Sequence, residues 1–321
     1  MNRRSALLAM AGLGLGAMLP AHAHANAWPE KPITIVVAFA PGGAVDFTAR
    51  TVANHLAQRT GWKVAVVNRP GGNGIIGASE VAKAAPDGYT LLCTLDAHSI
   101  NQILNPKVSY DTLQSFDYLS LLATIPQVLV TPAQSDIKTF EQFVAQAKGR
   151  DDPYGITGFA STSHLNLVSI LNHYKLPANF INYKGASELL TNLLGGHIAY
   201  ASTAISGVLA HVDSQRLNAI AISSRERSAL LPDVPSVSEF IPGYDMESWV
   251  GLVAPAGIPE DIKKIIAAEI RQTLDNQDVI EVFKKSGFNV VASSEAEFTE
   301  RVKRDQIRAV ELIEKKLLTT H

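Results

Sequence analysis

The sequence predicts an α/β protein that folds as two lobes with mainly parallel sheets. Apolar, β-rich runs alternate with stretches of helical periodicity along most of the chain, which is typical of layered α/β structure. The length points to two lobes, because the 321 residues without the first 27 leave 294, more than one compact core usually fills.

The first strand-loop-helix unit sets the pattern of the fold. Residues 33–39, ITIVVAF, predict a strand, and Val45, Ala49, Val52 and Leu56 follow at helical spacing. Near the C-terminus, amphipathic helices are expected at residues 259–276, 277–286 and 294–318. Further strands are expected at residues 63–67, 90–94, 127–130, 154–157, 178–183, 198–202, 218–223, 249–254 and 289–291.

A cleaved signal peptide is predicted at residues 1–27. Two arginines precede a charge-free apolar stretch, residues 5–19, and Ala25-Asn26-Ala27 fits a small-x-small cleavage site before Trp28. The apolar stretch is shorter than the roughly 20 residues needed to span a bilayer, which disfavours an uncleaved anchor. We therefore expect export to the periplasm, by the general secretory or the twin-arginine route.

Charge and cysteine content exclude several classes of function. Loss of residues 1–27 leaves 26 basic and 30 acidic residues, a net charge of −4, which predicts no nucleic-acid partner and no direct membrane insertion. No apolar run after residue 27 is long enough to cross a membrane. The single cysteine, Cys93, lies in the run TLLCTL, so we expect a buried thiol and no intrachain disulfide.

Three turns rich in glycine or serine come directly after predicted strands and open into helices. They are residues 40–46, APGGAVD, residues 157–164, TGFASTSH, and residues 183–187, YKGAS. Amides at a helix N-terminus stabilise anions without a cation, and ligands of open α/β sheets bind at the carboxyl ends of strands. These turns predict an anion-binding cleft, although Ser163 and Ser187 equally fit plain helix caps.

Several blocks of the sequence, in order, resemble one protein family. They are WPEKPITIVVAFAPGGAVDFTAR, NRPGGNGIIGASEVAKAAPDGYTLL, YKGASELLTNLLGGHI, LPDVPSVSEFIPGY and SWVGLVAPAGIP. Together they resemble the tripartite tricarboxylate transporter receptor family, the Bug solute-binding proteins. The resemblance implies a type II-like periplasmic-binding-protein fold, with two hinged lobes that enclose a carboxylate and deliver it to a two-subunit membrane permease. It also implies a monomer without a cofactor.

The resemblance implies a ligand site built from turns of both lobes. Lys184 is expected beside it, in a further wall with Gly185 and Ala186. Asp46 is expected to cap its helix or to orient a water, because it would repel a carboxylate. The ligand-binding residues carried over are Phe39, Pro41, Gly42, Gly43, Ala44 and Asp46 in the first turn and Ala160, Ser161, Thr162, Ser163 and His164 in the second.

Two further features bear on which ligand is bound. Where many family members carry an aspartate pair, this chain has Ala199 and Thr203, so a ligand ammonium would find no partner there and an organic acid is favoured over an amino acid. In the turn after Cys93, Asp96 and His98 are expected to contact the distal end of the ligand. Aromatic residues predict either a stacking surface for an aromatic acid or plain core: Phe39, Phe159, Tyr183, Tyr200 and Trp249.

Alternative functions stay open at this point. Ser161 and His164 supply residue types of a hydrolase, but no G-x-S-x-G elbow is present and both lie in one helix start. The histidines that remain after cleavage are scattered, so no metal site is expected. A periplasmic sensor subunit for a carboxylate would use the same two lobes as a transport receptor.

Two chain crossings are expected to form the hinge. They are residues 126–132 and 249–255, which place one lobe at 28–125 together with 248–321 and the other at 126–247. A ligand that contacts both lobes would favour the closed form.

Overall fold

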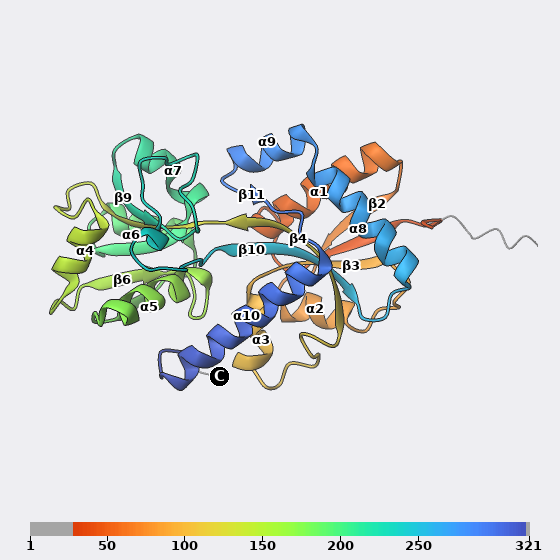
Figure 1. Cartoon of the computed structure of the whole chain (residues 1–321), viewed down its shortest axis with the longest axis horizontal. Coiled ribbons are helices and arrows are strands. Elements are labelled where there is room, and N and C mark those ends of the chain that lie inside the picture. Colours follow the sequence, from red (N-terminus) through yellow and green to blue (C-terminus); the bar gives the residue numbers. More distant parts are fainter. Residues whose placement is uncertain (1–27, 319–321) are drawn as a thin grey trace, which may run out of the picture. The chain divides into compact units, whose positions relative to one another are not determined.

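The computed structural model describes residues 28–318, and the signal-peptide prediction therefore lies outside the described residues. One compact unit begins at Lys31. Its strands form two sheets (Figure 1). The first sheet has the order β11-β4-β10-β3-β1-β2 and the second β7-β6-β8-β5-β9. The strands are β1 (Ile33–Val37), β2 (Val64–Asn68), β3 (Thr90–Leu95), β4 (Phe116–Ile125), β5 (Gln127–Pro132), β6 (Pro153–Ile156), β7 (Asn179–Asn182), β8 (Tyr200–Ala204), β9 (Leu217–Ile222), β10 (Ser248–Pro255) and β11 (Asn289–Val290).

Helices follow most of the strands, as the alternating sequence pattern predicts. The three C-terminal helices are confirmed, and each begins within two residues of its expected start. The helices are α1 (Ala44–Thr60), α2 (Ile75–Val81), α3 (Ala97–Leu104), α4 (Phe140–Ala147), α5 (Thr162–Tyr174), α6 (Ala186–Leu194), α7 (Ile205–Asp213), α8 (Glu260–Leu274), α9 (Gln277–Lys285) and α10 (Glu295–Glu314), with short 3-10 turns η1 (Gly72–Gly74) and η2 (Val237–Glu239).

The α/β class is confirmed, but the sheets are mixed and not mainly parallel. Strand β1 pairs in parallel with β2 and β3, and β6 with β7 and β8. The other five pairs are antiparallel, and they all involve β4, β5, β10 or β11. Strand β5 follows β4 of the other sheet across Pro126 alone, and β10 enters the first sheet after the chain returns from β9 of the second. Both strands therefore run against the strands that local crossovers add.

The chain passes between the two sheets in extended form. Only Pro126 separates β4 from β5, and β10 pairs with β4 along its whole length (Figure 1). Strand β4 was not predicted from the sequence. From these positions we propose that residues 28–125 and 248–318 form lobe I and residues 126–247 form lobe II.

Helix α10 adds a contact between the two proposed lobes. Its residues Ala309 and Leu312 pack in one apolar cluster with Ile100 and Leu104 of α3 and with Val168 of α5. Each lobe also has a large core of its own, around Trp249 and Phe298 in lobe I and around Phe143 and Tyr200 in lobe II.

The sequence also led to expectations about the single cysteine and about membrane-spanning segments. Cys93 is a free, fully buried thiol, and burial raises its pKa, so the expected buried thiol is confirmed. Among residues 28–318, the structure has no helix that is both long and apolar enough to span a membrane.

Candidate functional site

A cavity of about 650 Å³ lies between the two sheets and has walls from both. Its volume is in the range of small-molecule sites. Turns that follow strands supply most of the lining. The lining residues are Phe39, Ala44, Gly72, Asn73, Ile75, Leu95, Asp96, Ala97, Asn101, Leu104, Asn105, Ile125, Gln127, Thr157, Gly158, Phe159, Ala160, Ser161, Thr162, Ser163, Ala186, Thr203, Ala204 and Ser248.

The N-termini of six α-helices meet at this cavity. The first residues of α1, α2, α3, α5 and α6 are Ala44, Ile75, Ala97, Thr162 and Ala186, and Ala204 is the N-cap of α7. Amides in a first helical turn have no partner within the helix, and the helix dipole adds positive potential. The described lining contains no lysine, arginine or histidine, so the cavity favours an anion through main-chain groups.

The turn before α1 is fixed by Asp46. The Asp46 carboxylate accepts a hydrogen bond of 2.9 Å from the Gly42 amide and others from Arg50 and Asn68. The hydrogen bond from Arg50 lowers the pKa of Asp46 to about 2. Gly42 has a φ of 81°, which favours glycine. Asp46 is buried and does not line the cavity, so it shapes the turn.

The turn before α5 presents hydroxyl groups to the cavity. Ser161 caps the helix, because its Oγ accepts from the amide of His164, and it also lies 2.8 Å from Ser163 Oγ. The Thr157 amide donates to Ser163 Oγ at 3.4 Å. The Ser163 hydroxyl can donate to a carboxylate, and such charge-assisted bonds are stronger than neutral ones.

The geometry around His164 does not support a hydrolase. Its Nδ1 accepts a 3.0 Å hydrogen bond from the amide of Ala160, and the ring packs edge-on against Phe159 and Phe180. Ser161 Oγ donates to the carbonyl of Gly158 and not to the imidazole. Burial lowers the pKa of His164 to about 4. The serine nucleophile and the histidine base are therefore not coupled.

His98 lies in the core of lobe I and does not line the cavity. Its ring stacks on Tyr110 and meets Phe116 edge-on, and neither ring nitrogen has a hydrogen-bond partner among residues 28–318. Burial lowers its pKa to about 4, so the ring is neutral. His98 is therefore a core residue of lobe I, whereas Asp96 lines the cavity.

Asp96 is the one ionisable side chain of the described lining, and it connects three elements. It precedes α3, and its carboxylate accepts hydrogen bonds from Thr162 of α5 and, at 2.9 Å, from Ser248 of β10. Burial raises the pKa of Asp96 to about 7. The bond from Thr162 crosses between the two proposed lobes.

The structure brings many of the residues suggested by the sequence to one cavity. Those that line it are Phe39, Ala44, Asp96, Ala160, Ser161, Thr162, Ser163, Ala186 and Thr203. Those that do not are Pro41, Gly42, Gly43, Asp46, His98, His164, Lys184 and Gly185. Of the aromatic candidates only Phe39 and Phe159 face the cavity, while Tyr200 and Trp249 are buried core.

Sequence reasoning missed the turn at η1. Gly72 and Asn73 line the cavity, and Gly74 packs against the Phe39 ring, where an added Cβ would lie 3.1 Å from two ring atoms. The signal was present, because this glycine-rich turn follows β2 as the others follow their strands. Asn101, Gln127 and Ser248 carried no such signal, because they lie within a helix or at strand ends.

A two-lobed fold with a cavity between its sheets, lined by helix N-termini, is typical of solute-binding proteins. The sequence model of the protein family described as tripartite tricarboxylate transporter family receptor matches residues 48–318 of this chain. BugT of Bordetella pertussis is 32% identical over 294 residues, which are 90% of this chain and 90% of BugT. A protein from the tcbD-tcbE intergenic region of Pseudomonas sp. strain P51 is 30% identical over 90% of this chain and 87% of its own.

Solved structures agree with this relationship. The periplasmic binding protein BugD superposes with a TM-score of 0.76 at 25% identity over 92% of this chain and all of BugD. MatC of Rhodopseudomonas palustris, solved with bound malate, superposes with a TM-score of 0.72 at 28% identity over 87% of this chain and 98% of MatC. The chain belongs to the tripartite tricarboxylate transporter receptor family. It is thus a solute-binding receptor and not an enzyme.

Proposed function

We propose that this receptor binds a small organic carboxylate in the cavity between its sheets and delivers it, in the periplasm, to a two-subunit membrane permease. The observation that carries the proposal is the meeting of six helix N-termini at a cavity whose described lining has no basic side chain. Such a site holds a carboxylate by main-chain amides and hydroxyls. The relative MatC, solved with malate, supports a carboxylate as ligand.

A dicarboxylate or an aromatic acid fits the lining better than an amino acid. Many family members carry an acidic residue at the position of Thr203. In this chain the side chain there is neutral and faces the cavity. Both oxygens of Asp96 already accept hydrogen bonds from Thr162 and Ser248, which weakens Asp96 as a partner for an ammonium group. Phe39 and Phe159 offer apolar walls to the rest of the ligand.

Proline at the first helical position tests the role of the amides. Proline is tolerated there and removes only the amide hydrogen. The residues before Ala44 and Ala186, Gly43 and Gly185, are extended, with ψ of 176° and 171°, as a residue before proline must be. Gln277→Pro is the matched control, because Gln277 is the first residue of α9 and lies away from the cavity.

The experiment is calorimetric titration with malate, an aromatic acid and aspartate. We expect an organic acid to bind and Ala44→Pro and Ala186→Pro to weaken it roughly tenfold or more, as for a lost hydrogen bond to a charged group. The control should bind like the wild type. No binding of any carboxylate, or equal affinity in all variants, would contradict the proposal, and tight binding of aspartate alone would refute the preference for an organic acid.

A further inference from the structure

A second, smaller cavity is lined by arginines from both proposed lobes. It has a volume of about 240 Å³ and shares no lining residue with the ligand cavity. Arg225 follows β9, and Arg301, Arg304 and Arg308 lie on one side of α10. The remaining lining residues are Gly243, Asp245 and Asp305.

The positive charge of this cavity exceeds what its carboxylates neutralise. Arg301 is paired with Asp305 at 3.2 Å. Arg308 donates to the main-chain oxygen of Asp245 at 3.2 Å, and among residues 28–318 it has no carboxylate within ion-pair distance. Within the described residues, the side chains of Arg225 and Arg304 have neither a hydrogen bond nor an ion pair. The guanidinium groups of Arg225, Arg304 and Arg308 carry three positive charges. The carboxylate of Asp245 offsets one of them, which leaves a surplus of two.

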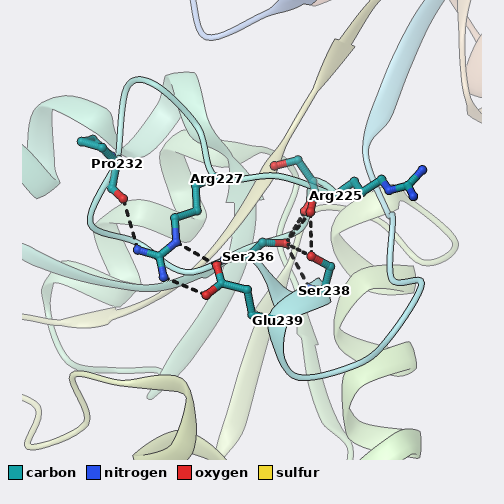
Figure 2. A network of polar contacts seen from close by, with 7 residues as sticks. Arg225, Arg227, Pro232, Ser236, Ser238 and Glu239 are labelled. Atoms are coloured by element: carbon teal, nitrogen blue, oxygen red, sulfur yellow. Dashed lines mark hydrogen bonds and ion pairs between the residues drawn. The ribbon is translucent and has the colours of Figure 1, made fainter.

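The backbone that carries Arg225 is held in place while its side chain is free. Figure 2 shows the hydroxyls of Ser236 and Ser238 donating to the Arg225 carbonyl, at 3.3 and 2.6 Å, beside the ion pair of Arg227 with Glu239. The Arg225 guanidinium extends away from this network. A positioned donor without a protein partner is suited to an external anion.

The arginines that lack a carboxylate partner among the described residues line one cavity but come from different parts of the fold. Arg225 belongs to proposed lobe II, whereas Arg304 and Arg308 belong to α10 of lobe I. An anion bound between these guanidinium groups would relieve their mutual repulsion. An anion bound there would join the two lobes at a place separate from the ligand cavity.

We propose that this cavity binds a small divalent oxyanion of the phosphate or sulfate type. A volume below the range of drug-sized sites suits a small anion, and a double negative charge matches the surplus of two. Arginine presents its donors in a planar fork that fits the oxygens of such an anion.

Titration calorimetry with sodium phosphate and with sodium sulfate, at constant ionic strength set with chloride, tests the proposal. The wild type is expected to bind one oxyanion, and Arg225→Gln and Arg304→Gln each to weaken binding roughly tenfold. Arg216→Gln is the matched control, since Arg216 is also an exposed arginine of lobe II but lies outside the cavity. It should bind like the wild type.

Three results would overturn the proposal. One is an absence of binding by both oxyanions in the wild type, and another is a loss in Arg216→Gln as large as in the two cavity variants. The third is that Ala44→Pro weakens oxyanion binding whereas the arginine variants do not. This result would place the oxyanion in the ligand cavity. The arginines do not line the ligand cavity, so failure here would leave the carboxylate proposal untouched.

Discussion

Asp96 shows how one side chain can serve both the binding cavity and the contact between lobes. It faces the cavity, accepts hydrogen bonds from Thr162 and Ser248, and lies otherwise within protein. Burial raises its pKa to about 7, compared with about 4 in an unfolded chain. Between these two pH values the folded protein binds more protons than the unfolded chain, so its unfolding free energy falls as pH rises.

Asp96→Asn is expected to remove this pH dependence. Between pH 5 and pH 8 the free energy of unfolding of the wild type should fall, relative to that of the variant, by on the order of 2 kcal/mol. This value is smaller than the full pKa shift implies, because water in the cavity screens the carboxylate. Urea unfolding at pH 5, 6, 7 and 8 measures the difference. Glu247, whose pKa burial also raises to about 7, is present in both proteins and cancels in the comparison. A difference that stays constant with pH would show that Asp96 is ionised throughout.

Individual elements were predictable where the pattern that forms them is local. The β1–α1 unit and the three C-terminal helices follow from periodicity, and the turns before α1 and α5 follow from their glycines and serines. The direction of a strand is not determined by local sequence, because the directions of β5 and β10 depend on where the chain crosses between the sheets. Gln127 and Ser248 reach the cavity for the same reason, which is why the sequence did not reveal them.

Strand β10 also contains a close approach that the sequence does not reveal. A Cβ on Gly251 would lie much closer to the nearest atom of the Phe298 ring than a van der Waals contact allows. This ring is fully buried and packs edge-on against Trp249 and Tyr118. Gly251→Ala should therefore lower the free energy of unfolding by about 3 kcal/mol through overpacking. Gly155→Ala is the comparison in lobe II, where the nearest atom, at 2.5 Å, is the flexible end of Ile198.

Calorimetric unfolding of both glycine variants checks the prediction. Gly155→Ala should cost about 1 kcal/mol, because the Ile198 side chain can change rotamer whereas a ring enclosed by two others cannot move. Equal melting temperatures for the two variants would mean that Phe298 has room to shift.

At the scale of the whole molecule, polar and apolar contacts hold the two proposed lobes at the angle seen here. The crossings at β4–β5 and β10 and the apolar cluster on α10 connect them covalently and by packing. The hydrogen bond from Thr162 to Asp96 differs from these, because it can break without loss of core packing. It lies at the edge of the ligand cavity, where a change in lobe angle alters the contacts of the ligand.

Thr162→Val keeps the shape of the side chain and removes this hydrogen bond. The loss of about 1 kcal/mol should shift the unliganded protein toward open forms and lower carboxylate affinity by roughly fivefold. Small-angle scattering of the unliganded protein separates this effect from a lost ligand contact, because only a change in lobe angle increases the radius of gyration. Thr191→Val, which removes a hydroxyl bonded within α6, is the control and should scatter like the wild type. If Thr162→Val lowers affinity but leaves the unliganded scattering unchanged, the hydroxyl acts on the ligand directly and the lobes are held by packing alone.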